Sequence, residues 1–290
     1  MNKKVLLISD KTPQHWVGDA FQVRTMFSYG SPGLGSAISP FLLLDYGDPR
    51  EVKPSPEQGG VGEHPHRGFE TVTIAYQGEV DHRDSAGHSG RIGPGDVQWM
   101  TAASGVVHEE KLSPDFMKRG GTIEMAQLWV NLPAKYKMSA PKYQSISRDQ
   151  IPTVALPNDA GSLRVIAGDY TNTQGPAQTF TPLNVWDVKL NANSKLDLPL
   201  PDNRTSLLAI LRGSITVNDA SKASGGQVVL LAAEGDGAMI QAESDAVFLV
   251  LNGEHIPEQI AGYGPFVMNT REEIHQAIED YQNGLMGHVE

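Results

Sequence analysis

The sequence predicts a mostly β-stranded chain in two halves, with a single helix near its C-terminus. Glycine and proline are abundant, at 30 and 19 of 290 residues, and they are spread along the chain, as in folds of short strands joined by tight turns. Helical periodicity is scarce, and short apolar runs occupy residues 41–44, 71–76, 123–130 and 247–251. The length suits either one large domain or two domains of about 150 residues each. Together these observations favour an all-β fold in two parts.

The first expected strand covers Val5–Ile8. Lys3 and Lys4 precede this apolar run, as they would in a secretory signal peptide, but Asp10 and Lys11 end it after a few residues. A signal peptide needs an apolar region of about 7–15 residues, so a strand is the preferred interpretation. No stretch of about 18 apolar residues occurs, so no transmembrane helix is expected, and the expected compartment is the cytoplasm.

One helix is expected near the C-terminus. Apolar residues recur there at the spacing of an amphipathic helix, at Ile274, Ala277, Ile278 and Tyr281. Thr270 and Glu273 stand at capping-box spacing just before these positions, and Gly284 follows as a stop signal.

A domain boundary is expected near residue 135, which gives domains of residues 1–135 and 136–290, the second ending in the helix. Prolines punctuate the sequence around this boundary, at Pro133, Pro141, Pro152 and Pro157. Each half also has a turn with a Gly-Asp pair before an apolar strand, at 93–96 and at 234–237. This similarity favours a duplicated β-barrel, and two unrelated hairpin turns are the alternative.

Composition excludes several classes of function. The chain has 34 acidic and 23 basic residues, a formal net charge of -11, whereas a nucleic-acid groove needs clustered Lys and Arg. It contains no cysteine, which removes disulfides, Cys-ligated zinc, iron–sulfur clusters and thiol nucleophiles. Direct nucleic-acid binding and membrane insertion are therefore not expected.

Histidine is unevenly distributed. Six of the nine histidines precede residue 110, namely His15, His64, His66, His82, His88 and His108. His64 and His66 point to the same face if the chain is extended, about 6.5–7 Å apart along the backbone. Glu70 shares their parity if the strand is unbroken, and Pro65 favours a strand edge or entry. Two imidazoles at this spacing can converge on one metal ion.

A second group lies about 40 residues further along the chain. His108 and Glu110 share parity, Glu109 points away, and the turn sequence at 90–96 could fold this strand back beside the first. Neutral imidazole and carboxylate suit a divalent first-row metal. The leading hypothesis is a site of three histidines and one carboxylate, and separate surface histidines are the alternative.

Longer strings carry a family resemblance. The sequence is similar to the pirin family of the cupin superfamily in HPHRGFET at 64–71, PGDVQWMTA at 94–102, QLWVNL at 127–132 and GPFVMNT at 264–270. HWVGD at 15–19 and FLLLD at 41–45 resemble bacterial members of this family. The strings occur in order and span both halves of the chain.

The resemblance implies two cupin barrels packed face to face, with one Fe(II) ion in the N-terminal barrel. It implies the metal ligands His64, His66, His108 and Glu110. Cupins in general use the glutamate after the paired histidines, here Glu70, but the pirin match is closer and favours Glu110. Ni, Cu, Mn or Zn could substitute for iron. The C-terminal barrel lacks histidine in its strand-rich region, so no second metal site is expected there.

Resemblance to bacterial pirins with quercetinase activity implies a quercetin 2,3-dioxygenase that acts on a flavonol-like aromatic substrate and O2. Either Glu110 or Glu70 would accept the proton of the flavonol hydroxyl as general base. Core packing is the expected role of four apolar and aromatic residues, with walls for a flat ligand as the alternative: Phe69, Trp99, Met100 and Trp129. The alternative function is a non-enzymatic, iron-redox-sensitive regulator that acts through a protein partner. A metal-independent isomerase ranks last.

Other candidates have simpler interpretations. His82 and His88 fall in a polar stretch expected to be a surface loop, with a site entrance as the alternative. His255 and His275 are expected to be surface or packing residues. Arg67 could orient a carboxylate or form a structural ion pair.

Overall fold

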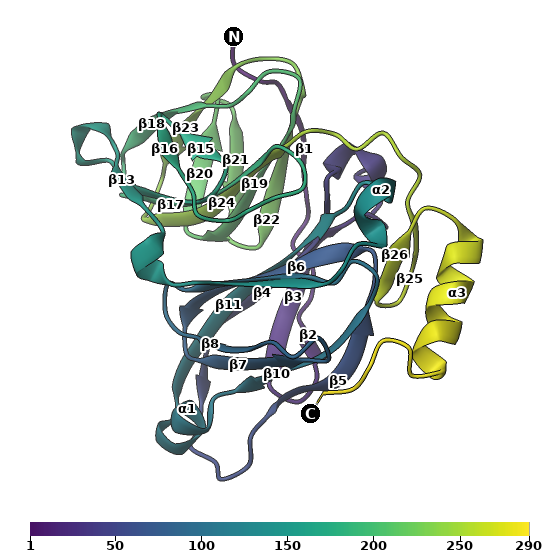
Figure 1. The fold of residues 1–290 in the computed structure, drawn as a ribbon. Helices are drawn as coiled ribbons and strands as arrows, with labels where there is room; N and C mark the ends of the chain where they lie inside the picture. The colour runs from purple at the N-terminus through teal and green to yellow at the C-terminus, as the bar shows by residue number, and fades with distance from the viewer. Residues whose placement is uncertain (290) are drawn as a thin grey trace. The chain divides into compact units, whose positions relative to one another are not determined.

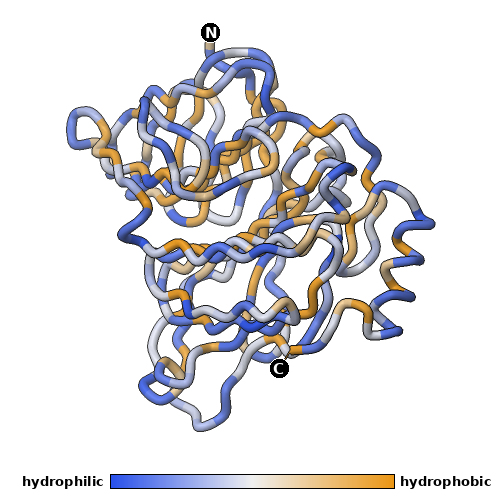
Figure 2. The backbone as a smooth tube through the Cα atoms, in the orientation of Figure 1, coloured by the Kyte–Doolittle hydropathy of each residue, from blue (hydrophilic) through white to orange (hydrophobic). Residues whose placement is uncertain are grey.

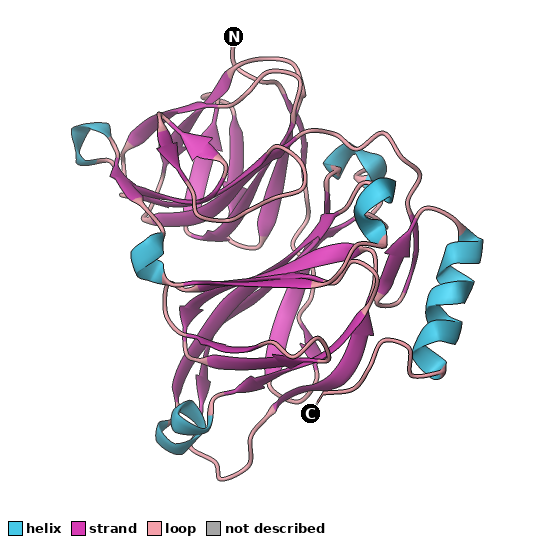
Figure 3. Cartoon of the chain, in the orientation of Figure 1, coloured by secondary structure: helices cyan, strands magenta, loops and turns pink. Residues whose placement is uncertain are grey.

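The computed structural model describes residues 1–289 and consists mainly of β-strands (Figures 1 and 3). Strands make up 52% of the chain, and only one of the three α-helices in the described residues, α3 (Arg271–Gln282), is longer than seven residues. The predicted mostly-β class is therefore confirmed. None of the helices within residues 1–289 is long and apolar enough to cross a membrane.

The chain forms two compact units, each assembled from several segments. Unit 1 contains Met1–Pro13, Thr25–Leu43 and Asp149–Ile256, and unit 2 contains Gln14–Arg24, Leu44–Arg148 and Pro257–Glu290. The units thus differ from the expected linear division at residue 135. The N-terminal residues belong with the later half of the chain, and the C-terminal residues belong with the earlier half.

Pairing between distant segments explains this exchange. Strand β1 (Val5–Ile8), at the position expected from the sequence, pairs antiparallel with β22 (Gln227–Leu231). Residues of the C-terminal segment, including Phe266 and Ile274, share a buried apolar cluster with Val107. Edge strands and apolar surfaces are covered wherever a complementary segment reaches them, irrespective of its distance in sequence.

Unit 1 contains a larger and a smaller antiparallel sheet. The larger sheet has the spatial order β1, β22, β19 (Thr205–Arg212), β24 (Ala246–Gly253), β17 (Leu183–Leu190), β14 (Gly161–Ala167) and β13 (Thr153–Ala155). The smaller sheet has the order β18 (Lys195–Pro199), β23 (Gly237–Ala242), β20 (Ser214–Val217) and β21 (Ser221–Ser224). Strands from both sheets contribute to one buried core that includes Leu163, Trp186, Ile240 and Phe248.

Unit 2 repeats this combination of sheets. Its four-stranded sheet has the order β5 (Gly60–His66), β10 (Val106–Leu112), β7 (Val80–Asp84) and β8 (Ser89–Ile92). The seven-stranded sheet has the order β12 (Lys142–Ile146), β9 (Val97–Thr101), β6 (Phe69–Gln77), β11 (Gly121–Asn131), β4 (Phe41–Val52), β3 (Phe21–Ser28) and β2 (His15–Val17). Strands β3 and β4 cross the boundaries between the units.

Short elements connect and flank these sheets. They are α1 (Pro114–Arg119), α2 (Ala134–Lys137), the 3-10 turns η1 (Gly35–Ile38), η2 (Arg148–Gln150) and η3 (Pro157–Asp159), and the two-stranded sheets β15 (Asp169–Tyr170) with β16 (Thr173–Gln174) and β25 (Ala261–Tyr263) with β26 (Phe266–Met268). Hydrophobic residues lie along the strands of both units, and hydrophilic residues lie in many of the connections between them (Figure 2). The four apolar runs noted in the sequence lie in β4, β6, β11 and β24.

Helix α3 begins as the sequence predicts. The Thr270 hydroxyl accepts from the Glu273 backbone N–H, and the Glu273 carboxylate accepts from the Thr270 backbone N–H, which completes the capping box. Ile274 and Ala277 are buried against the rest of unit 2, whereas Tyr281 is 38% exposed. The amphipathic pattern therefore buries its first two positions and leaves its last one largely at the surface.

Candidate metal centre

The four-stranded sheet of unit 2 brings together three histidines from two strands. His64 and His66 lie on β5, and His108 lies on β10 directly opposite His64. Alternate residues of a strand share a face, and so do directly opposite residues of an antiparallel pair. The three side chains therefore project to the same side of the sheet, and we call them the histidine cluster.

The rings of the histidine cluster lie close together. The ring centroid of His108 is 4.2 Å from that of His64 and 4.9 Å from that of His66. One potential ligand atom from each histidine lies within 4.8 Å of the other two. Imidazole nitrogens bind a transition metal at about 2.0–2.1 Å, so three nitrogens at this spacing are close to the arrangement that a shared ion requires.

In each ring of the cluster, Nδ1 already has a partner within the protein. Nδ1 of His64 contacts the Gly62 carbonyl oxygen at 2.8 Å, Nδ1 of His66 contacts the Pro265 carbonyl oxygen at 3.3 Å, and Nδ1 of His108 lies 3.4 Å from Nδ1 of His82. Metal-binding histidines are commonly held in this way through the nitrogen that does not bind the metal. The Nε2 atoms remain available, and Nε2 of His108 is buried without a hydrogen-bond partner within residues 1–289. This unsatisfied buried atom fits a metal ligand.

Burial also favours the neutral form that binds a metal. Burial, with a smaller contribution from the neighbouring His64, lowers the pKa of His66 to about 3. The pKa of His108 is likewise lowered, first by burial and then by the surrounding histidines. His64 is only partly buried, so it marks the side of the cluster that is open to solvent.

Glu110, the fourth predicted ligand, lies beside the cluster on β10. It forms a second group with His108 and His82, in which one potential ligand atom from each residue lies within 4.8 Å of the others. Its carboxylate accepts hydrogen bonds from Thr73 Oγ1 at 3.2 Å, Gln98 Nε2 at 3.2 Å and Gln127 Nε2 at 2.9 Å. His108 thus belongs to both groups and links Glu110 to His64 and His66.

Residues of the seven-stranded sheet form a wall next to the cluster. The ring of Trp129 is 5.3 Å from that of His66 and 4.3 Å from that of Phe69. Trp129 and Thr71 are opposite each other on β11 and β6, so they share a face. Two buried polar atoms on this wall, Thr71 Oγ1 and Trp129 Nε1, have no hydrogen-bond partner in the described part of the chain.

The other two candidates, Trp99 and Met100, lie on opposite faces of the seven-stranded sheet. Trp99 is opposite Val72, and therefore lies on the other face of the seven-stranded sheet from Thr71. Met100 is opposite Thr71, so it lies on the same face as Trp129, where it is fully buried in a small apolar cluster with Ala102 and Val106. Of the four aromatic and apolar candidates, Phe69 and Trp129 are thus the two whose rings contact His66.

The structure does not bring Glu70 to the histidines, contrary to its shared parity in the sequence. The strand is broken between His66 and Phe69, where Gly68 adopts a left-handed conformation with φ of 90°. Within β6, Glu70 and Thr73 are an odd number of residues apart, and Thr73 is the residue that contacts Glu110. Glu70 therefore points to the opposite face, where it accepts a hydrogen bond from Thr101 Oγ1 at 2.7 Å.

His82 is not in a surface loop, so that expectation is wrong. It lies on β7 opposite Glu110, is 1% exposed, and contacts Asp84 Oδ2 through Nε2 at 3.2 Å. Alternation within β7 buries His82 and Asp84 and turns the intervening Arg83 outward. The alternation of residues in this stretch could therefore have indicated a strand with His82 on its buried face. The charged residues around His82 made the stretch look like a polar loop. His88, by contrast, is partly exposed and contacts Asp84 at the end of this sheet.

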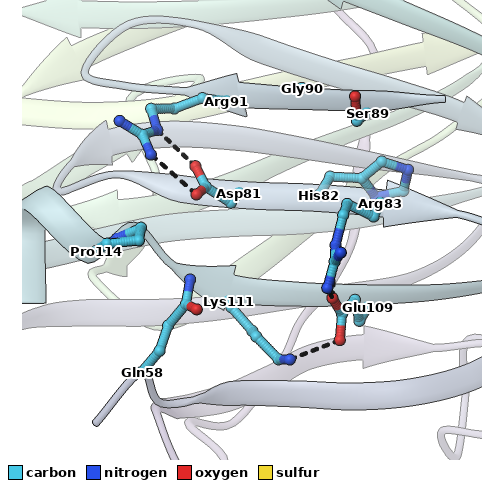
Figure 4. Close-up of a pocket in the computed structure, with 10 residues that line it drawn as sticks. All are labelled: Gln58, Asp81, His82, Arg83, Ser89, Gly90, Arg91, Glu109, Lys111 and Pro114. Atoms are coloured by element: carbon cyan, nitrogen blue, oxygen red, sulfur yellow. Dashed lines mark hydrogen bonds and ion pairs between the residues drawn. The ribbon is translucent and has the colours of Figure 1, made fainter. Parts of the chain in front are cut away.

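The outward-facing side chains of the same sheet form ion pairs with one another (Figure 4). Glu109 accepts from Arg83 and from Lys111, and Arg91 donates to Asp81. They line a shallow cavity of about 400 Å³. The strands thus carry candidate ligands on one face and paired charges on the other, as the opposite orientations of Glu109 and Glu110 predict.

Comparisons with known proteins identify the family. The model for Pirin matches residues 21–130, and the model for the Pirin C-terminal cupin domain matches residues 185–287. A Pseudomonas aeruginosa protein named "Putative quercetin 2,3-dioxygenase" is 56% identical over 282 residues, which cover 97% of this chain and 98% of that protein. The chain belongs to the pirin family.

Solved structures agree with this assignment. A crystal structure of quercetin 2,3-dioxygenase from Acinetobacter baumannii matches this pirin with a TM-score of 0.97 and 52% identity, over 100% of both chains. The Escherichia coli pirin YhhW, crystallised in complex with nickel(II), matches with a TM-score of 0.64 and 18% identity, over 86% of this chain and 99% of that chain. The second similarity shows the fold alone. The predicted family and its cupin fold are confirmed.

The buried Glu70 of this pirin gives a testable pH dependence. Burial raises the pKa of Glu70 from 4.5 to about 7. Between pH 4.5 and about pH 7, the folded chain therefore keeps a proton on Glu70 that the unfolded chain has released. Stability should therefore fall as pH rises across this window. Glu70→Gln removes the titration, and its free energy of unfolding relative to the parent should increase by about 2 kcal/mol between pH 5 and pH 8.

Urea denaturation of chelator-treated protein at both pH values measures this difference. Other titrating groups are common to parent and variant, so their contributions cancel. Glu57→Gln, at an exposed position, is the matched control and should show no such change. If the difference in free energy of unfolding between Glu70→Gln and the parent did not vary with pH, the raised pKa of buried Glu70 would be contradicted.

Proposed function

We propose that this pirin is a metal-dependent dioxygenase that cleaves flavonols such as quercetin. The observation that carries the proposal is the histidine cluster, with buried Nε2 of His108 unsatisfied and the carboxylate of Glu110 beside it. The names of the Pseudomonas aeruginosa and Acinetobacter baumannii relatives supply the reaction class. Substrate and O2 would enter from the partly exposed side of His64.

The proposed ligands are His64, His66, His108 and Glu110. Nitrogen and oxygen ligands without a thiolate suit Fe(II), and they also accept Ni, Cu, Mn or Zn. The complex of YhhW with nickel(II) is one instance of a pirin with a metal other than iron. An iron ion held by these residues would supply open coordination positions and a redox-active centre for the reaction with O2.

Glu110 is the proposed general base of the reaction. A flavonol must lose its hydroxyl proton before its ring can be oxidised, and a carboxylate can accept this proton. The donors Thr73, Gln98 and Gln127 hold the Glu110 carboxylate in place. Glu70 lies on the other face of β6, and we therefore do not retain it as a base.

The wall next to the cluster suits a flat, oxygen-rich ligand. The rings of Phe69 and Trp129 offer apolar surface beside His66, and Thr71 Oγ1 and Trp129 Nε1 offer unsatisfied hydrogen-bonding atoms. A flavonol combines aromatic rings with hydroxyl and carbonyl groups, so it can use both kinds of contact.

Loss of the flavonol absorbance band tests the proposed function. Iron-loaded protein should consume quercetin under air and should not consume it under argon. If the protein binds iron but consumes no flavonol under air, the dioxygenase proposal is wrong. Capture of a protein partner in only one iron oxidation state would then support the regulator as the alternative function.

A further inference from the structure

The segment Gly264–Thr270, which carries one of the family strings, lies against the turn that follows the ligand His66. The Arg67 backbone N–H donates to the Pro265 carbonyl at 3.4 Å, and the Val267 N–H donates to the Arg67 carbonyl at 3.0 Å. Gly68 is so close to this segment that an added Cβ would lie 2.0 Å from the Val267 carbonyl oxygen. Almost 200 residues of sequence separate these two pieces of backbone, yet they form a single structure within unit 2.

This segment also sets the state of the His66 ring. The Pro265 carbonyl oxygen is 3.3 Å from His66 Nδ1. A carbonyl can only accept, so it favours the neutral tautomer with hydrogen on Nδ1 and a free lone pair on Nε2. That lone pair is what a metal ion requires from His66.

Lys137, on α2, fastens the two pieces of backbone together. Its ammonium group donates to the Gly68 carbonyl at 2.6 Å, to the Val267 carbonyl at 2.9 Å and to Asn131 Oδ1 at 2.6 Å. The side chain is 1% exposed, so all three ammonium protons are used within the protein. Burying a charged amine is costly unless it is hydrogen-bonded. Two of the three hydrogen bonds that offset this cost connect the turn after His66 to the segment Gly264–Thr270.

Arg67 completes the arrangement from the side of α3. Its guanidinium donates to the Ser104 carbonyl at 2.6 Å and to Asp280 Oδ2 at 2.7 Å. The side chains of Arg67 and Asp280 are 6% and 16% exposed, so the pair is largely shielded from solvent. Arg67 therefore forms the structural ion pair considered from the sequence, and it anchors the same turn.

We infer that Lys137 is a positioning residue for the metal centre, which holds the Pro265 carbonyl against His66 and thereby fixes this ligand for a divalent metal ion. The inference rests on the proposed metal site, but it concerns a residue that touches none of the ligands of that site. A purely structural Lys137 would contribute to folding and leave the affinity of the folded protein for metal unchanged.

Binding of Co²⁺ tests this inference, because its visible absorption reports the number and arrangement of its ligands. The test variant is Lys137→Met, which removes the ammonium group and keeps an unbranched side chain. Lys135→Met, at an exposed position of the same helix, is the matched control. We expect Lys137→Met to weaken Co²⁺ binding by about 10- to 100-fold and to alter the absorption of bound Co²⁺, with the control unchanged.

The double variant His64→Ala/His66→Ala tests the proposed metal site separately from the positioning role of Lys137. If it binds Co²⁺ as tightly as the parent does, the proposed metal site is wrong. If it loses Co²⁺ but Lys137→Met binds with the affinity and absorption of the parent, the site is supported and the positioning role of Lys137 is overturned.

A second variant covers the case in which Lys137→Met does not fold, as judged by circular dichroism. Pro265→Gly loosens the residue that carries the carbonyl without removing a donor, and Pro257→Gly at an exposed position is its control. Relative to that control, we expect Pro265→Gly to weaken Co²⁺ binding by about two- to fivefold. Equal affinities of the two variants would overturn the inference.

Discussion

Replacing His108 by alanine is expected to weaken metal binding strongly and to abolish flavonol turnover. His108 is fully buried and belongs to both groups of potential ligands, so its loss leaves neither group complete. We expect the affinity for Co²⁺ to fall by roughly 100-fold or more, beyond the usual effect of residues that only support a ligand. Metal analysis and Co²⁺ titration of the folded variant measure this loss.

His275→Ala is the control for that experiment, since His275 lies on the exposed side of α3. It should retain the metal content and turnover of the parent. Retention of one tightly held metal ion by folded His108→Ala would show that the metal is bound elsewhere, and would remove the structural basis of the proposed function.

Replacing Glu110 by glutamine is the second change with a large expected effect. An amide cannot accept the substrate proton, and its NH2 group would face the donors Gln98 and Gln127. Loss of general-base catalysis lowers rates by about 100- to 10,000-fold. Turnover of quercetin by the metal-loaded variant, corrected for metal content, measures this effect.

Glu109→Gln offers a closely matched control. Glu109 neighbours Glu110 on β10 but points to the outer face, where it pairs with Arg83 and Lys111. Turnover by this variant should stay within about twofold of the parent, since the Glu109 carboxylate points away from the histidine cluster and its partners Arg83 and Lys111 lie on the outer face. Comparable losses in both glutamine variants would mean that the strand as a whole, and not the carboxylate of Glu110, determines activity.

Local sequence patterns were sufficient to predict some elements of the fold. The apolar run at Val5–Ile8 and the capping box of Thr270 and Glu273 depend on neighbouring residues, and both occur as predicted. The composition of the two units could not be obtained in this way. It depends on the pairing of β1 with β22 and on the packing of α3 near Val107, which are contacts between distant segments.

For the candidate site too, local patterns in the sequence predicted part of the arrangement. Strand parity correctly placed His64 with His66, and their meeting with His108 follows from the pairing of β5 and β10. Parity failed for Glu70, because the turn at Gly68 breaks the strand before it. It was not applied to His82, although alternation within β7 buries this residue next to His108.

Supporting groups were the hardest to foresee. The Pro265 carbonyl and the Lys137 ammonium reach the turn after His66 from residues about 70 to 200 positions further along the chain. Neither a backbone carbonyl nor a lysine in a short helix carries a local signal of such a role. Only the folded arrangement of unit 2 reveals it.

The fate of molecular oxygen tests the central claim most directly. Iron-loaded protein should be supplied with quercetin under oxygen-18 gas, and the products should be analysed by mass spectrometry. Cleavage by a dioxygenase predicts that both labelled atoms enter the products, and that folded His108→Ala yields no labelled product. Products without the label, or equal labelling with the His108→Ala variant, would contradict oxygen chemistry at the histidine cluster.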